Sequence, residues 1–390
     1  MRQRERYALI LGMLTALGPL CTDFYLPALP NITTHLGIST SVTQLTLTTA
    51  LVGLGVGQLI FGPLSDRLGR KTPLMVSLGL FIVASVWCAL APSITQLMTA
   101  RFIQGVAGAG GAVLSRAIAR DGYSGPELTR FFAILMAING VAPIAAPVLG
   151  GLQLTITGWQ GLFITLAVAG LAMMLIAGVW LQESHPASVR AKQHQAFFSA
   201  FGDVLKHRRF MGLCLVQGFM LAGLFAYIGA SSYVFQSAWH LSPQQYSWLF
   251  ATNGVGLIVF SLLTVKLTGR FSEPRVLMGV LVLAVIFSAV MLVCGTVASS
   301  LSVVLLALFL TVSINSAVCT LAGAMAMETQ RKHAGMASAF LGTLMFVMGG
   351  ISAPLTGIGG TSMASMTVVI LLSYVLALVS YLVLGRQKTV

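Results

Sequence analysis

The sequence predicts an all-α membrane protein, and three observations lead to that class. Of its 390 residues, 57% are hydrophobic and only 8% are charged, whereas soluble domains carry about 25% charged residues. The apolar residues form continuous runs of about 20, the length that a helix needs to cross a bilayer. These runs are too long and too uniform for the alternating strands of a membrane barrel. Lipid is therefore the solvent that suits most of this chain.

Twelve apolar runs can be delimited, and we expect each to be a membrane-spanning helix. They lie near residues 7–29, 42–64, 73–92, 95–120, 131–152, 160–182, 210–236, 244–266, 276–296, 300–327, 334–358 and 362–385. A polar stretch separates the first six from the last six. The sequence thus predicts an N-terminal six-helix half (1–182), a cytoplasmic linker (183–209) and a C-terminal six-helix half (210–390). Such halves commonly hold a substrate site between them near the middle of the bilayer.

The positive charges indicate the orientation of these spans. Every Lys and Arg except Arg101 and Arg116 falls at a terminus or in a loop on the same side as both termini. Because Lys and Arg gather on the cytoplasmic side of membrane proteins, we expect both termini in the cytoplasm. The net charge of +13 is spread over short loops and reports topology, so nucleic-acid binding is not expected.

Asp23, in the first span, is the acidic residue that we single out. It is the one member of nine that falls well inside a predicted span, where an ionised carboxylate is costly. Counted along the helices, Arg101 in the fourth span reaches the same depth within one turn, so we expect it to be the partner of Asp23. Burial and a nearby cation act in opposite directions on a carboxyl group, a balance that suits a proton carrier. Alternatively, Asp23 caps the helix end before Pro27 and faces water.

The cytoplasmic end of the second span carries the strongest motif. Gly62 to Lys71 reads GPLSDRLGRK, in which two glycines allow a tight turn and three cations surround one acid. A cytoplasmic loop explains the cations, but it does not explain Asp66 or the glycines at fixed places.

This segment resembles the signature between helices 2 and 3 of the major facilitator superfamily. Six further segments are similar to its drug:proton antiporter family, in particular the Bcr/CflA subfamily of bicyclomycin and chloramphenicol exporters. They are DFYLPALP (23–30), QLTLTT (44–49), GQLIFGP (57–63), RFIQG (101–105), RDGY (120–123) and APVLGG (146–151). The last looks like the end of the antiporter motif of helix 5, with Ala in place of its first Gly. The second half matches in pattern, with Gly269 and Arg270 as a faint echo of the signature.

The resemblance implies a proton-coupled exporter of small amphiphilic molecules, such as bicyclomycin or phenicols, that works by alternating access. It implies a monomer in the inner membrane of a bacterium. Arg70 would bridge to Asp121, and Asp66 would meet the start of helix 11 near Ala334, closing a latch. The residues of that latch are Gly62, Asp66, Arg67, Gly69, Arg70, Lys71 and Asp121. The positions that match the helix 5 motif, which in this family seals the interface between the halves, are Pro143, Pro147, Gly150 and Gly151.

The candidate substrate contacts are uncharged residues, namely amides, a hydroxyl and an aromatic residue of the last six spans, together with one amide of the fifth span. They are Asn139, Gln217, Phe225, Ser232, Asn253 and Asn315. A mostly apolar cavity with a few amides suits neutral or weakly charged compounds. Such a residue by itself more often forms a hydrogen bond that packs two helices together.

Other functions are less consistent with the residues. A uniporter or symporter of the same fold remains open. A membrane-embedded enzyme would need clustered catalytic groups, and a channel would need rings of charge or filter loops; neither pattern occurs in the sequence. The chain has no phosphate-cradling loop, and its five cysteines lie in predicted spans without paired spacing. We therefore expect no enzyme activity, metal or cofactor.

Overall fold

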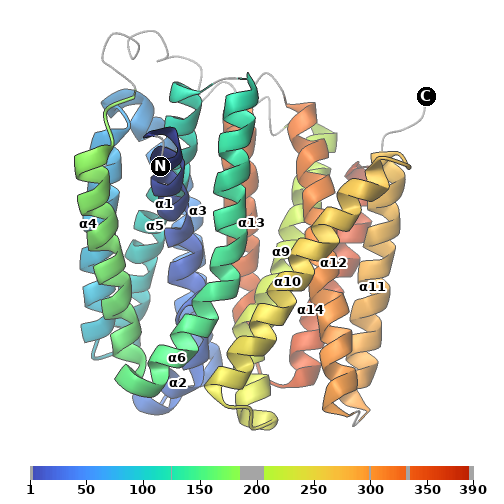
Figure 1. The fold of residues 1–390 in the computed structure, drawn as a ribbon. Helices are drawn as coiled ribbons and strands as arrows, with labels where there is room; N and C mark the ends of the chain where they lie inside the picture. The colour runs from blue at the N-terminus through green and yellow to red at the C-terminus, as the bar shows by residue number, and fades with distance from the viewer. Residues whose placement is uncertain (1–2, 124, 185–205, 298–299, 331–333, 386–390) are drawn as a thin grey trace. The chain divides into compact units, whose positions relative to one another are not determined.

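The structure of this chain is a computed structural model. It describes residues 3–123, 125–184, 206–297, 300–330 and 334–385, without the side chains of 3–6, 125–140, 143 and 334–336. All regular structure in these ranges is helical (Figure 1), which confirms the all-α class. Eleven helices in the described part of the chain are long and apolar enough to cross a membrane.

The chain divides into two compact units. Unit 1 comprises residues 1–37 and 49–197, and unit 2 comprises residues 38–48 and 198–390. The start of the second predicted span therefore belongs to unit 2. There the side-chain amide of Gln44 donates hydrogen bonds to the carbonyl of Gly229 at 2.9 Å and to the hydroxyl of Thr356 at 3.1 Å.

Unit 1 contains the first helices of the chain. They are α1 (Gln3–Asp23), the 3-10 turn η1 (Leu26–Ala28), α2 (Leu29–Leu36), most of α3 (Thr40–Leu68), α4 (Lys71–Leu90), α5 (Ile94–Gly122) and α6 (Gly125–Trp180). The first span differs from the prediction. Its α-helix ends at Asp23, and the chain continues through η1 and α2 to Gly37, whose left-handed backbone (φ 61°) ends α2. Pro27 lacks the backbone N–H that a continuous helix would require.

The fifth and sixth predicted spans lie together in α6. This helix has 56 residues, which at 1.5 Å per residue would extend about 84 Å, nearly three times the hydrocarbon thickness of a bilayer. It is interrupted at Gly158, whose φ of 68° and ψ of −178° are not helical. The chain turns back on itself in this helix (Figure 1).

Small residues let helices of unit 1 approach closely. A Cβ atom on Gly53 or Gly57 of α3 would collide with the carbonyl oxygens of Phe102 or Val106 of α5, and one on Gly105 would collide with the carbonyl of Ala50. Membrane helices commonly pack through such small residues because lipid provides no hydrophobic drive for association. This close contact holds α5, which carries Arg101, against α3.

Unit 2 contains the remaining helices. They are α9 (Arg208–Tyr233), followed by a π-helical turn (Val234–Ala238), α10 (Pro243–Thr268), α11 (Glu273–Thr296), α12 (Leu301–Thr329), α13 (Ala334–Leu355) and α14 (Met363–Ser380), followed by a second π-helical turn (Tyr381–Gly385). Helix α9 packs against α12, α13 and α14. The start of α9 lies beside the turn that follows α14, because the Arg208 guanidinium donates to the carbonyl of Val383 at 3.3 Å.

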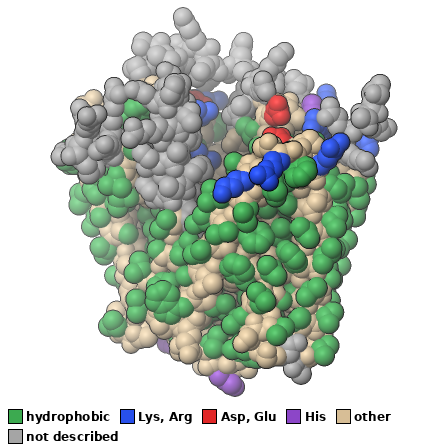
Figure 2. All heavy atoms as spheres, turned by 45° about the vertical axis from the view of Figure 1, so that its right-hand side comes forward, with side chains coloured by type: hydrophobic (Ala, Val, Ile, Leu, Met, Phe, Trp, Pro, Cys, Tyr) green, Lys and Arg blue, Asp and Glu red, His purple; other side chains and the backbone are tan. Residues whose placement is uncertain are grey.

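The surface is apolar along the helices and basic at one end. Figure 2 shows hydrophobic side chains covering a flank whose upper edge carries Lys and Arg. At the junction of α10 and α11, Lys266, Arg270 and Arg275 are exposed. Such a distribution is typical of a helical membrane protein.

Candidate functional site

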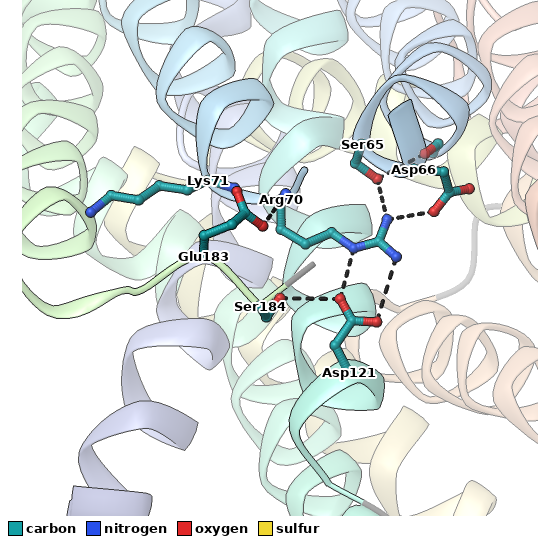
Figure 3. A network of polar contacts seen from close by, with 8 residues as sticks. Ser65, Asp66, Arg70, Lys71, Asp121, Glu183 and Ser184 are labelled. Carbon is teal, nitrogen blue, oxygen red and sulfur yellow. Dashed lines mark hydrogen bonds and ion pairs between the residues drawn. The ribbon is translucent and has the colours of Figure 1, made fainter. Parts of the chain in front are cut away.

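The first candidate site is a charge cluster in unit 1 where α3, α5 and α6 end and α4 begins. Its members are Ser65, Asp66, Arg70, Lys71, Asp121, Glu183 and Ser184 (Figure 3). Only Gly69 and Arg70 connect α3 to α4. Gly69 has a φ of 89°, a left-handed conformation that glycine adopts readily. This tight turn positions Arg70 among the other members.

Arg70 is the centre of the charge cluster. Its Nε donates to Asp121 Oδ2 at 2.8 Å, and its Nη1 donates to Asp66 Oδ1 and to Ser65 Oγ, both at 2.6 Å. The side chain of Arg70 is 8% exposed. Burial alone would lower the pKa of its guanidinium, but the hydrogen bonds and charges of Asp121 and Asp66 raise that pKa above its ordinary value. Arg70 is thus held as a cation by two carboxylates.

Three residues of the charge cluster, Ser65, Glu183 and Ser184, were not among the site residues predicted from sequence. The carboxylate of Glu183 accepts hydrogen bonds from the backbone N–H groups of Arg70 at 2.8 Å and Lys71 at 3.1 Å, at the N-terminus of α4. The hydroxyl of Ser184 donates to Asp121 at 3.1 Å. A carboxylate is favoured at a helix N-terminus by the unpaired amides and the helix dipole. In the sequence, the only signal was an acid in a loop directly after an apolar run.

The other predicted latch residues are more loosely held. A Cβ atom on Gly62 would meet open space, so this glycine is not required by packing. Arg67 is exposed. The Lys71 ammonium donates to the carbonyl of Gly178 at 2.9 Å, which ties α4 to the end of α6.

The second candidate site surrounds Arg101, which is fully buried in α5. Its Nη1 donates to the carbonyl of Cys21 at 2.7 Å and to the side-chain oxygen of Gln104. Its guanidinium lies 4.2 Å from the ring centre of Tyr25 and 5.6 Å from that of Phe163. The charge of Arg101 is therefore stabilised by dipoles and aromatic faces.

The expected ion pair between Asp23 and Arg101 is absent. Asp23 is 5% exposed, accepts a hydrogen bond from the hydroxyl of Thr22 at 3.0 Å and forms no ion pair with the described Arg101. The physical reason is the end of α1 at Asp23. The last carbonyls of a helix lack intrahelical partners and attract cations, and Arg101 binds one of them, that of Cys21. The charges of Arg101 and Asp23 still interact through space.

The helix 5 motif lies beside the end of α1. A Cβ atom on Gly150 would overlap the carbonyl oxygen of Phe24, so only glycine allows α6 to approach here. Pro147 and Gly151 are buried. Asn139 and Pro143 fall among the side chains that lie outside the described part of the structure.

The candidate substrate contacts of unit 2 are all buried, and all of them except Ser232 contact a neighbouring helix. Side-chain amides donate from Gln217 to the carbonyl of Cys319 at 2.6 Å, from Asn253 to the hydroxyl of Tyr227 at 2.9 Å, and from Asn315 to the carbonyl of Met220 at 2.6 Å. Ser232 accepts from the Gln236 amide at 2.7 Å, and the ring of Phe225 lies 6.3 Å from that of Phe346. Apart from the bond of Ser232, which lies within α9 and the turn that follows it, these contacts pack α9 against its neighbours. The side-chain oxygens of Gln217 and Asn253 are buried and have no hydrogen-bond partner among the described atoms.

Known proteins resemble this chain over most of its length. The family model described as Major Facilitator Superfamily matches residues 11–237, and that described as MFS/sugar transport protein matches residues 127–384. A Bacillus subtilis (strain 168) protein named Uncharacterized MFS-type transporter YdgK is 38% identical over 390 residues, covering 99% of this chain and 97% of that protein. A Haemophilus influenzae protein named Bicyclomycin resistance protein homolog is 28% identical over 350 residues, covering 88% and 87%.

A solved structure shows the same fold. The crystal structure of a bacterial homolog of the human lysosomal transporter Spinster, in an inward-facing and unoccupied conformation, matches with a TM-score of 0.80. The match covers 100% of both chains at 16% sequence identity. At that identity the likeness is one of fold alone.

Proposed function

Because the chain belongs to the major facilitator superfamily, we propose that it is a proton-coupled exporter of small amphiphilic molecules that works by alternating access. The observation that carries this proposal is the carboxyl group of Asp23, buried beside the guanidinium of Arg101 without forming an ion pair with it. A carboxyl group within the membrane that has no cation in an ion pair with it is more stable protonated than ionised. Asp23 is thus the proton carrier of the proposal.

The proposed topology has twelve spans with both termini in the cytoplasm of a bacterium, in its inner membrane. Eleven candidate spans are present in the described residues, and α6 supplies two of the twelve because of its length and its break at Gly158. In unit 1, the start of the chain and the end of α6 are adjacent, since the amide of Gln182 donates to the hydroxyl of Tyr7 at 3.3 Å. An even number of spans per half is consistent with that contact. We propose a monomer as the working form.

The proposed transport cycle assigns a role to each site. Asp23 takes up a proton from outside and releases it inside, while substrate leaves in the opposite direction. The charge cluster around Arg70 stabilises one of the two states of the cycle through its ion pair with Asp121. In the same proposal, Asp66 interacts with the N-terminus of α13 in addition to Arg70, because a helix N-terminus favours an acidic side chain.

The proposed substrates are neutral or weakly charged drugs, of which bicyclomycin and chloramphenicol are the first to test. A relative named Bicyclomycin resistance protein homolog supports this choice. The buried side-chain oxygens of Gln217 and Asn253, which have no hydrogen-bond partner among the described atoms, suit the hydroxyl and amide donors of such molecules. The match to a family model described as MFS/sugar transport protein favours, as a second candidate, uptake of a nutrient.

Growth protection and transport in proteoliposomes test the proposal. Cells lacking their own efflux pumps are expected to survive higher drug concentrations with the wild-type chain and not with Asp23→Asn. In proteoliposomes, the wild type should move drug uphill against an imposed proton gradient, while Asp23→Asn should exchange drug only downhill. Full uphill export by Asp23→Asn would eliminate Asp23 as the proton carrier. Movement of drug in the same direction as protons would favour the symporter.

A further inference from the structure

Gln104 and Ser85 lie beside Arg101 and have no role in the proposal above. Both side chains are completely buried, Gln104 in α5 and Ser85 in α4. Gln104 Nε2 donates to Ser85 Oγ at 2.7 Å, and Ser85 Oγ donates to the carbonyl of Phe81 at 2.7 Å. A chain of hydrogen bonds therefore runs from Arg101 through two side chains to the backbone of α4.

The chemistry of its members fixes the direction of this chain. A guanidinium can only donate, so the oxygen of the Gln104 amide must face Arg101 and its NH₂ group must face Ser85. The Ser85 proton is used on the carbonyl of Phe81, so the Ser85 oxygen is left to accept. Each group has one possible orientation, and the last acceptor belongs to a helix backbone, which cannot rotate away.

This chain of hydrogen bonds holds the guanidinium of Arg101 in place independently of the carboxyl group of Asp23. Nη1 of Arg101 donates both to the carbonyl of Cys21 and to Gln104, while its Nε and Nη2 have no hydrogen-bond partner among the described atoms. Both acceptors are neutral, so Arg101 is held in place without an ion pair to Asp23. The carboxyl group can then change its protonation while Arg101 stays in place.

We propose that Gln104 and Ser85 are positioning residues that hold Arg101 beside Asp23 without letting the two form an ion pair. This inference rests on the proposed role of Asp23. Without Gln104 and Ser85, the guanidinium of Arg101 would be free to turn towards Asp23, and the resulting ion pair would keep Asp23 permanently ionised. The other titratable groups near the two charges are the thiols of Cys21 and Cys88 and the phenol of Tyr25, which are neutral at pH 7 by their ordinary values.

The test is the titration of the Asp23 carboxyl band by infrared difference spectroscopy of the reconstituted full-length protein. The band is identified by its loss in Asp23→Asn. The midpoint is expected to move by about one pH unit or more in Gln104→Leu. The isosteric Gln104→Glu, whose added carboxylate competes for Arg101, is expected to move it as well. Ser85→Ala is expected to give a smaller shift.

Ser77→Ala is the matched control for Ser85→Ala. Ser77 is also fully buried in α4, and its hydroxyl bonds to the carbonyl of Leu74 at 2.8 Å within its own helix. Ser77→Ala should therefore leave the midpoint of the Asp23 titration unchanged.

A second readout compares uphill export of radiolabelled chloramphenicol with its exchange at equal pH. Gln104→Leu is expected to lower the rate of uphill export about tenfold or more and the rate of exchange at equal pH less than about twofold.

The outcomes separate this inference from the proposed function. If the Asp23 band titrates in the wild type but Gln104→Leu and Gln104→Glu leave its midpoint unmoved, Gln104 does not position Arg101, and the inference is wrong. If the wild type shows no titrating Asp23 band, the proposed proton carrier itself is wrong. The titration needs no substrate, so it decides the matter whether or not chloramphenicol is transported.

Discussion

Replacement of Asp121 by Asn is expected to loosen the junction between α3 and α4 more than replacement of Asp66 by Asn. Both carboxylates bind Arg70, but the side chain of Asp121 is 18% exposed and that of Asp66 is 47% exposed. Exposed ion pairs contribute about 0.2–1 kcal/mol, whereas hydrogen bonds to charged groups contribute about 1.5–3 kcal/mol. We therefore expect a loss of about 1.5 kcal/mol for Asp121→Asn and of about 0.5 kcal/mol for Asp66→Asn.

Hydrogen exchange of the backbone amides over residues 69–74 measures this loss. The amide of Arg70 is bonded to Glu183, and that of Leu74 to the carbonyl of Arg70 at 3.3 Å. A loss of 1.5 kcal/mol corresponds to roughly tenfold faster exchange through local opening, and 0.5 kcal/mol to about twofold. Ser184→Ala, which removes only an exposed bond to Asp121, is the control.

The salt dependence distinguishes the effects of the two substitutions further. Raising the ionic strength to about 1 M shortens the screening length to about 3 Å, which affects exposed charges most. The effect of Asp66→Asn should then vanish, while that of Asp121→Asn should persist. Equal acceleration by the two variants, or a larger effect of Asp66→Asn, would refute the reasoning from burial.

Three further predictions concern pH, packing and membrane potential. Because the pKa of Arg70 is raised above its ordinary value, the stability that the charged guanidinium contributes is complete below that ordinary value and is lost only above it. The protection of the same amides, corrected for intrinsic exchange, should therefore show no change due to Arg70 between about pH 6 and 9. Gly150→Ala should lower thermal stability by about 1–3 kcal/mol, measured by unfolding in detergent, since its Cβ overlaps the carbonyl of Phe24; Gly62→Ala, with open space around it, is the control. If Asp23 carries one proton per cycle, an inside-negative potassium diffusion potential without a pH gradient should drive export of a neutral drug, by about 2.3 kcal/mol per 100 mV. The same potential should not drive export of a monovalent cation. Failure to drive export of the neutral drug would contradict a stoichiometry of one proton.

Most of the fold could be predicted from sequence because the bilayer constrains it strongly. Apolar length identified the helices, and GPLSDRLGRK indicated the family, which the matching relatives confirm. Hydropathy also placed a break between the fifth and sixth spans, and the backbone of α6 is non-helical there, at Gly158. A break inside an apolar stretch was harder to predict, and hydropathy extended the first helix past Asp23, where α1 ends.

The candidate sites show the limit of arguments from spacing. The contact between Arg70 and Asp121 was expected from the motif and is present. The pair of Asp23 and Arg101 was expected from equal depth, and depth alone does not reveal a backbone carbonyl that competes for the guanidinium. Glu183 was missed for a related reason, because its partners are backbone amides of α4. Backbone groups carry no letter in a sequence, so contacts to them cannot be predicted from residue types.

The neutral surroundings of Arg101 also bear on how the chain enters the membrane during synthesis. An arginine at the centre of an inserting helix costs about 2.5–3.5 kcal/mol, so α5 alone is a poor candidate for insertion. Three of its partners, the Cys21 carbonyl, the Tyr25 ring and Ser85 behind Gln104, precede α5 in the chain. They have therefore left the ribosome before Arg101 does. Because α1 and α4 precede α5 in the chain, we expect these partners to be in the membrane already when Arg101 arrives, so that its charge need not be exposed to lipid.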